Sequence, residues 1–129
     1  MDDTQSTFNI QSWNEEILQE WEGGSMREAK VRQAYHGHLR GESDLVYLMT
    51  YTEGGRARFV GTELFEGTVG EREGRMSLHH EGTFENGVAR STCRVVPGSG
   101  TGELEGISGE GRFEADGNKV AFRFSYEMD

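Results

Sequence analysis

Residues 59–84, "FVGTELFEGTVGEREGRMSLHHEGTF", decide the fold class, because apolar and polar side chains alternate on both sides of a short turn. Alternation with a period of two is typical of a β-strand with one buried face. The same pattern recurs from "TFNIQSW" near the start to "VAFRFSYEM" near the end. Eight such segments, joined mainly by tight turns, predict an all-β fold, an eight-stranded antiparallel up-and-down barrel, since closure removes exposed sheet edges. A β-sandwich is the alternative.

The domain organisation follows from the chain's length and from its N-terminal segments. With 129 residues, the chain is long enough for one domain with a single core, residues 1–129. Residues 1–6 are expected to form a flexible tail. Residues 12–29 are ambiguous, because Ser12 and Glu15 have the spacing of a helix capping box. We favour a strand followed by an irregular crossover there over a short helix.

Charge excludes several classes of partner. The chain carries 13 Lys and Arg against 23 Asp and Glu, a net charge of -10. Nucleic acids and anionic membrane surfaces both attract basic proteins, so neither is an expected partner. No stretch has the length and apolarity of a membrane-spanning helix. The single cysteine, Cys93, cannot form an internal disulfide, and we expect a cytoplasmic protein. The sequence does not decide whether the protein forms a homo-oligomer.

The glycine-rich stretch at residues 95–111, "VVPGSGTGELEGISGEG", resembles a phosphate-binding loop only superficially. The third glycine of a dinucleotide fingerprint is missing at the required spacing, and no Lys-Ser or Lys-Thr pair follows. No helix pattern follows either, and three glutamates in the stretch would repel an anion. We therefore expect no nucleotide and no other cofactor. The stretch is expected to connect two strands tightly at 97–102.

The hairpin turns predict which residues face each other across the sheet. Asn86-Gly87 is typical of a type I′ turn, which would place His80 opposite Cys93. Centring the preceding turn on 70–73, "GERE", places Glu63 opposite His80 and Gly61 opposite Gly82. A turn at Asp116-Gly117 predicts two further pairs of a glycine with an aromatic ring, Gly111 with Phe122 and Gly109 with Phe124.

Glu63 and His80 are two polar residues on an otherwise apolar inward face. Beside them Gly61 and Gly82 add no side-chain volume, so the pattern predicts an acid–imidazole pair next to a gap. We take Glu63 and His80 as candidate catalytic residues. The alternative is a buried pair that only satisfies its own hydrogen bonds. The candidate ligand-binding residues are Tyr51, Phe59, Gly61, Phe65, Leu78, Gly82, Cys93, Phe122, Phe124 and Tyr126.

Two other kinds of site are weaker interpretations of the same residues. Glu63, His80 and Cys93 together would supply three metal ligands, but solvated strand histidines and a buried cysteine explain the pattern more simply, so we expect no metal site. Cys93 beside His80 also has the makeup of a thiol–imidazole pair. A reactive thiolate would need access and a third orienting group, which the sequence does not indicate.

The segments "VYLMTY", "FVGTELFEGTVGEREGRMSLHHEGTF" and "VVPGSGTGELEGISGEG" resemble, in the same order, those of an uncharacterised bacterial family, a domain-of-unknown-function family with an allene-oxide-cyclase-like β-barrel. The resemblance covers nearly the whole chain. It implies an eight-stranded barrel with a central cavity. The wider class includes cyclases and isomerases of apolar unsaturated substrates and dirigent proteins that only orient a ligand. The resemblance brings no catalytic assignment for any residue.

Two functions are therefore expected. The first is binding of a small, largely apolar ligand inside the barrel, with isomerase or cyclase activity as one form of it. The second is a non-catalytic structural or protein-interaction module whose barrel is filled by its own side chains. A cavity beside Gly61 with Glu63 and His80 at its wall would favour the first. The sequence does not decide whether the protein is an enzyme.

Overall fold

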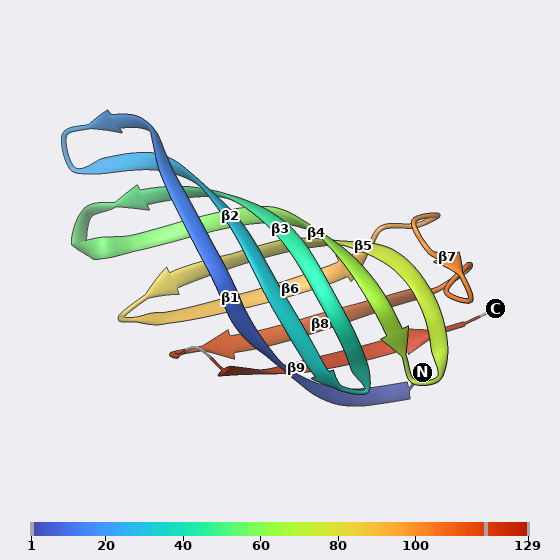
Figure 1. The fold of residues 1–129 in the computed structure, drawn as a ribbon. Helices are drawn as coiled ribbons and strands as arrows, with labels where there is room; N and C mark the ends of the chain where they lie inside the picture. Colours follow the sequence, from blue (N-terminus) through green and yellow to red (C-terminus); the bar gives the residue numbers. More distant parts are fainter. Residues whose placement is uncertain (1, 118, 129) are drawn as a thin grey trace.

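The computed structural model describes residues 2–117 and 119–128, and it is built almost entirely of β-strands (Figure 1). A single short 3-10 turn, η1 (Glu53–Gly55), interrupts the described strands. The strands are β1 (Asp2–Trp21), β2 (Gly24–Gly37), β3 (Leu39–Thr52), β4 (Arg56–Val69), β5 (Arg72–Glu85), β6 (Val88–Val95), β7 (Thr101–Gly102), β8 (Ser108–Ala115) and β9 (Lys119–Glu127).

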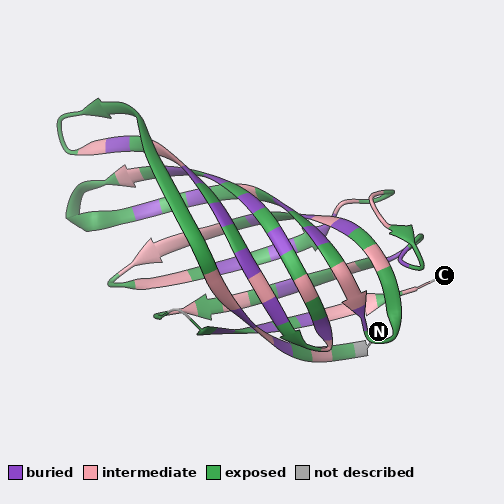
Figure 2. Ribbon diagram, in the orientation of Figure 1, coloured by how far each residue is buried: buried purple, intermediate pink, exposed green. Residues whose placement is uncertain are grey.

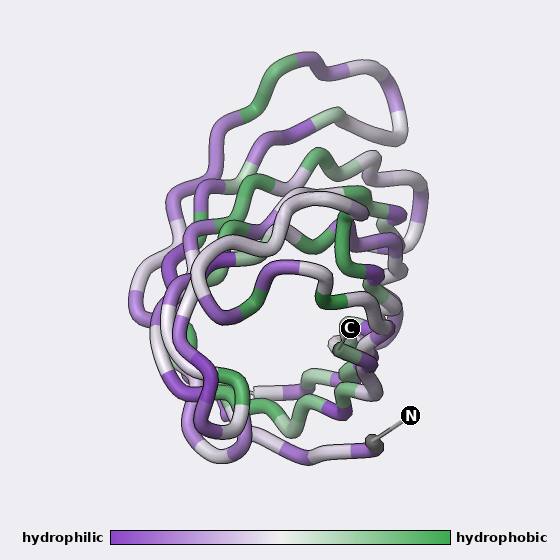
Figure 3. Tube along the Cα trace, turned by 90° about the vertical axis from the view of Figure 1, so that its right-hand side faces the viewer, coloured by the Kyte–Doolittle hydropathy of each residue, from purple (hydrophilic) through white to green (hydrophobic). Residues whose placement is uncertain are grey.

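Eight of these strands form a closed antiparallel barrel. Their order around it is β4-β3-β2-β1-β9-β8-β6-β5, and pairing of β4 with β5 completes the ring. The two-residue strand β7 adds to β5 outside this order. Viewed from the right-hand side of Figure 1, the trace closes on itself (Figure 3). The eight-stranded up-and-down barrel predicted from the alternation is thus confirmed.

The N-terminal strand differs from its prediction. β1 continues through residues 12–21 and turns tightly into β2, with Trp21 paired to Gly24, so neither the short helix nor the irregular crossover forms. Two register shifts, between Ile10 and Ser12 and between Ile17 and Gln19, bend this long strand. The structure places residues 2–6, expected as a tail, in β1, where they pair with β9. Met1 lies outside the described residues.

Burial alternates along much of β2, β3 and β4, as the period-two pattern requires (Figure 2), whereas residues 11–21 of β1 are all exposed. On β3, Leu45, Tyr47 and Met49 are buried, whereas Val46 and Leu48 between them are exposed. The interior contains two apolar clusters. The larger includes Phe65, Phe122 and Phe124, and the smaller consists of Ala29, Val31, Leu45, Tyr47, Met49 and Phe59.

Of the three hairpin registers predicted from the turns, the structure confirms one and shifts the other two. Asn86 and Gly87 both have positive φ, 54° and 78°, and His80 pairs with Cys93 as predicted. The β4–β5 pairing is displaced by two residues, because the turn is the two-residue Gly70-Glu71 rather than the centre of "GERE". Of these two turn residues only Gly70 has a positive φ. This fits a type II′ turn, which is also common in hairpins.

The β8–β9 pairing is also displaced by two residues. Phe113 pairs with Phe122 and Gly111 with Phe124, because the connection at Asp116-Gly117 is longer than a two-residue turn. Gly109 pairs with Tyr126 rather than Phe124. Since each displacement is an even number of residues, every side chain keeps its predicted face of the sheet.

Residues 96–107 lie at the end of the barrel that carries the N and C marks (Figure 1). Leu104 and Ile107 from this connection are buried in the larger apolar cluster. Backbone hydrogen bonds fix the connection to β5, from Val96 to Ser77 and from Glu103 to Glu73. The glycine-rich stretch therefore forms a plug, and the tight connection expected at 97–102 lies within it.

Two glycines allow the backbone of the plug to approach closely. A Cβ atom added to Gly74 on β5 would lie 2.0 Å from the Thr101 carbonyl oxygen. A Cβ at Gly100 would lie 2.0 Å from the Leu104 carbonyl oxygen. Both distances are shorter than any non-bonded carbon–oxygen contact, so the packing requires glycine at both positions.

Candidate functional site

Glu63 is at the centre of a buried hydrogen-bond network inside the barrel. Its Oε1 atom lies 2.6 Å from His80 Nε2, and its Oε2 atom accepts a hydrogen bond of 2.7 Å from the Tyr35 hydroxyl. The side chains of Glu63 and His80 are 0% and 1% exposed. A buried carboxylate is stable only when donors replace its lost hydration, and these two groups supply them.

The network extends to a side chain at each end. The Gln33 amide nitrogen donates to the Tyr35 hydroxyl over 3.0 Å, and His80 Nδ1 lies 3.1 Å from the Ser91 hydroxyl. The five residues come from β2, β4, β5 and β6. Their side chains lie on the inward face of each strand, so the chain of hydrogen bonds crosses the barrel interior.

The predicted contact between Glu63 and His80 is present, but the two residues are not directly opposite each other. Glu63 pairs with Leu78, and His80 pairs with Gly61. They are diagonal neighbours on the same face, and diagonal neighbours are within reach of long side chains. The contact survives the two-residue displacement because both side chains are long and point inward.

The gap expected beside the two glycines is filled by aromatic rings, so that expectation is wrong. A Cβ at Gly61 would lie 2.5 Å from a ring carbon of Tyr47, and a Cβ at Gly82 would lie 2.5 Å from one of Phe59. The glycines therefore make room for these two rings. The rings pack against each other with centroids 5.2 Å apart, and both line the cavity described next.

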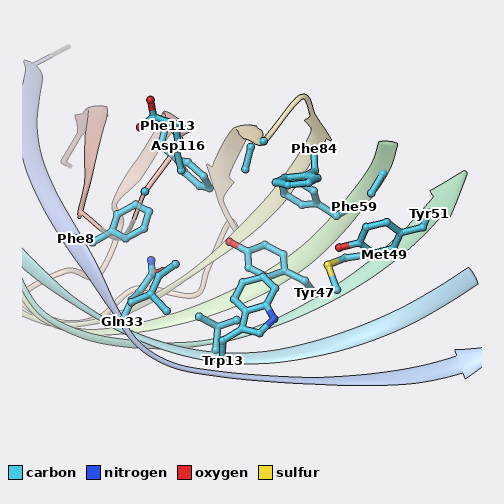
Figure 4. A pocket seen from close by; sticks show the side chains of 17 residues that line it. Phe8, Trp13, Gln33, Tyr47, Met49, Tyr51, Phe59, Phe84, Phe113 and Asp116 are labelled. Atoms are coloured by element: carbon cyan, nitrogen blue, oxygen red, sulfur yellow. The ribbon is translucent and has the colours of Figure 1, made fainter. Parts of the chain in front are cut away.

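A cavity of about 340 Å³ opens at the end of the barrel opposite the plug (Figure 4). It lies where β1 continues beyond Asn9, the last residue in its described pairing with β9. Ile10 and Trp13, from this later part of β1, line the cavity. The full lining consists of Phe8, Ile10, Trp13, Val31, Gln33, Tyr47, Met49, Tyr51, Ala57, Phe59, Phe84, Gly87, Ala89, Phe113, Ala115, Asp116 and Gly117. Aromatic and aliphatic side chains dominate it.

The structure brings only some of the candidate site residues to this cavity. Tyr51 and Phe59 line it, whereas Glu63 and His80 do not. Gly61 and Gly82 lie beneath the rings of Tyr47 and Phe59. The remaining candidates are in or against the larger apolar cluster: Phe65, Leu78, Cys93, Phe122, Phe124 and Tyr126. Tyr126 also contacts His38, with its hydroxyl 2.6 Å from the ring nitrogen.

Sequence reasoning missed several residues of the cavity and the network. Gln33 and Tyr35 alternate with exposed or half-buried residues on β2, so the period-two pattern places them on the inward face with Val31. Trp13 was missed because it lies in the segment whose strand assignment was uncertain. Its ring stacks on Tyr47 with centroids 6.2 Å apart.

Burial strongly perturbs the phenols around Glu63. It raises the pKa of Tyr35 well above the ordinary value, and the negative charge and hydrogen bond of Glu63 raise that pKa further. The pKa of Tyr47 is raised well above the ordinary value by burial first and then by the charge of Glu63. Both hydroxyls consequently stay protonated at neutral pH, and the Tyr35 hydroxyl donates its proton to Glu63.

Cys93 is buried, and burial followed by the charge of Glu63 raises the pKa of its thiol. A thiolate, not a thiol, reacts with disulfide reagents. We therefore expect dithionitrobenzoate at pH 8 to label the native protein roughly 100-fold more slowly than the denatured protein, since access and ionisation both fall. Labelling at equal rates, followed by absorbance, would contradict this placement of Cys93.

Within residues 2–117 and 119–128, no three His, Cys, Asp or Glu side chains converge as metal ligands would. Among the same residues, no helix has the length and apolarity to cross a membrane.

Comparisons with known proteins identify a family. A family described as "Protein of unknown function (DUF3224)" matches residues 4–126. The fold is similar to the crystal structure of a protein with unknown function from the DUF3224 family from Shewanella oneidensis MR-1. The TM-score is 0.88 at 25% sequence identity, over 100% of this chain and 98% of that chain. No curated protein matches the sequence.

These matches confirm the expected resemblance to a family of unknown function with an eight-stranded barrel, while its allene-oxide-cyclase-like character stays a prediction. Because the match spans nearly all residues, the chain belongs to the DUF3224 family.

Proposed function

We propose that the protein binds a small, largely apolar ligand in the cavity at the open end of the barrel. The observation that carries the proposal is the cavity itself, about 340 Å³ in volume and lined mainly by aromatic and aliphatic side chains. Small-molecule sites are typically concave, mostly apolar and at least about 300 Å³ in volume. A barrel with no ligand to hold would gain stability by filling such a space.

The alternative function is a non-catalytic module whose barrel is filled by its own side chains, and only one half of the molecule fits that description. The plugged end is densely packed, with Phe65, Met76 and Phe124 each 0% exposed. The open end keeps its cavity although large aromatic rings surround it. This difference between the two ends favours a binding protein over a purely structural module.

Isomerase or cyclase activity has weaker support than binding. Acid–base catalysis requires a group within hydrogen-bond reach of the reacting atoms. Glu63 and His80 are not among the residues that line the cavity, and the Tyr47 ring contacts His80 with centroids 5.9 Å apart. Gln33 links the cavity to the network through Tyr35. We therefore assign Glu63 and His80 to positioning and stability rather than to contact with the ligand.

Filling the cavity should abolish binding. Ala89 on β6 lines the cavity, so we expect Ala89→Trp to weaken binding of a neutral dimethylaminonaphthalene ketone dye by at least about tenfold, because the indole occupies the space of the dye. Binding is followed by the blue shift and brightening of the dye emission. The matched control is Ala121→Trp, since Ala121 is exposed on β9 and does not line this cavity.

Two outcomes would overturn the proposal. One is the absence of saturable dye binding to the wild-type protein. The other is equal binding by the wild type and a folded Ala89→Trp variant, which would place the dye elsewhere. Circular dichroism of both variants shows whether the barrel is intact.

A further inference from the structure

The Tyr47 hydroxyl has no hydrogen-bond partner among the described residues, and it belongs to a side chain that lines the cavity. Tyr47 is 7% exposed, and the structure gives its hydroxyl no hydrogen bond to any of the residues it describes. Its neighbour Tyr35 differs, because that hydroxyl both accepts from Gln33 and donates to Glu63. The buried side-chain atoms without a partner among the described residues are Asn9 Oδ1 and Ser43 Oγ. The Tyr47 hydroxyl is not one of them, so it is accessible from the cavity and its donor is free for a ligand.

The hydroxyl points into the cavity. Tyr47 lines it, and Figure 4 shows the hydroxyl directed away from Tyr51 and Met49, toward the side where Phe8 and Gln33 lie. Three rings hold the phenol in place: Phe59 in edge contact, Trp13 stacked, and His80 in edge contact beneath. A side chain held in this way presents its donor in one direction without further loss of entropy.

The charges around the cavity disfavour an anion. Asp116 is the charged residue among the described lining residues, and none of them is basic. The nearby guanidinium of Arg27 lies over the Tyr51 ring and is paired with Glu15 at 2.8 Å. A carboxylate ligand would therefore be buried close to Glu63 without a counter-charge, which is costly.

We infer that the ligand of this cavity carries an uncharged, hydrogen-bond-accepting oxygen, such as a carbonyl, on a largely aromatic or apolar body, and that this oxygen binds the Tyr47 hydroxyl. The inference rests on the proposed function and adds the chemical class of the ligand. The aromatic walls hold the body, and Tyr47 orients it by its one polar atom.

Three naphthalene probes of nearly equal shape test the inference: methyl naphthyl ketone, isopropenylnaphthalene as its hydrocarbon isostere, and naphthoate. In Tyr47→Phe we expect the ketone to bind about fivefold to tenfold more weakly, since one hydrogen bond is lost, and the hydrocarbon to bind unchanged. Naphthoate should bind the wild type at least about tenfold more weakly than the ketone. Displacement of the fluorescent dye measures all three affinities.

A control variant and a stability measurement separate binding from folding. Tyr126→Phe, remote from the cavity, should leave the affinity of both neutral probes unchanged. Without ligand, Tyr47→Phe should not lower the Tm, because its hydroxyl has no partner to lose, whereas Tyr35→Phe should lower it.

The results distinguish failure of the oxygen contact, of the ligand class and of the proposed binding function. If both neutral probes bind and Tyr47→Phe changes their affinities equally, the oxygen contact is refuted and the binding function stands. If naphthoate binds the wild type as tightly as the ketone, the ligand class is wrong. If no probe binds the wild type, the proposed function itself fails.

Discussion

Glu63→Ala should lower the free energy of unfolding by about 3–5 kcal/mol, because the cost of unsatisfied buried polar groups adds to the cost of a void. The truncation would leave the His80 ring and the Tyr35 hydroxyl without the carboxylate that each contacts at 2.6 Å and 2.7 Å. It would also open a void in a packed interior. Urea denaturation followed by circular dichroism measures the loss.

Two variants make this result interpretable. Glu63→Gln keeps the shape and can still accept from Tyr35, so we expect a smaller loss, about 1–2 kcal/mol. Glu66→Ala is the matched surface control on the same strand, where Glu66 pairs with Arg75 at 2.9 Å in solvent; such pairs contribute about 0–1 kcal/mol. If Glu63→Ala cost no more than Glu66→Ala, the network would not stabilise the barrel.

Leu104→Ala should destabilise the protein by about 2–5 kcal/mol, the range for a leucine truncated in a core. Leu104 is 0% exposed and belongs to the apolar cluster beneath the plug. The Leu48→Ala change removes the same atoms from a leucine that is 44% exposed on the outer face of β3, and it should cost much less. Thermal unfolding of the two variants measures the difference.

The same variant tests whether the two ends of the barrel act independently. Leu104 does not line the open-end cavity, so a folded Leu104→Ala protein should bind the naphthalene ketone dye with unchanged affinity. Equal stability of Leu104→Ala and Leu48→Ala would refute the plug as part of the core.

Which side chains point inward was predictable, because successive residues of a strand point to alternate faces of the sheet. A displacement of two residues between β4 and β5, or between β8 and β9, leaves Glu63, His80 and Phe122 on the inward face. The Asn86-Gly87 turn was predictable in full, since its residues favour the positive φ that a type I′ turn needs. The position of the Gly70-Glu71 turn was not predictable, because glycine favours a turn whereas glutamate does not.

The role of the strand glycines could be predicted only in part. The ring of Phe122 does cover Gly111, and a Cβ there would lie 2.5 Å from it, although Gly111 pairs with Phe124 in the ladder. Which ring covers which glycine depends on side-chain torsions, and local sequence does not determine these. For the same reason the space at Gly61 was expected to be empty, and it is filled by Tyr47.

The sequence by itself determined the barrel, the inward face and the acid–imidazole pair, because period-two alternation and turn chemistry are local properties that survive small errors of register. Only the tertiary structure decided where the empty space lies. The plug at residues 96–107 fills one end, and the run of β1 beyond β9 leaves the other open. Cavities arise from how distant segments pack together, so the proposed binding site lies at the aromatic walls around Tyr47 and not at Glu63 and His80.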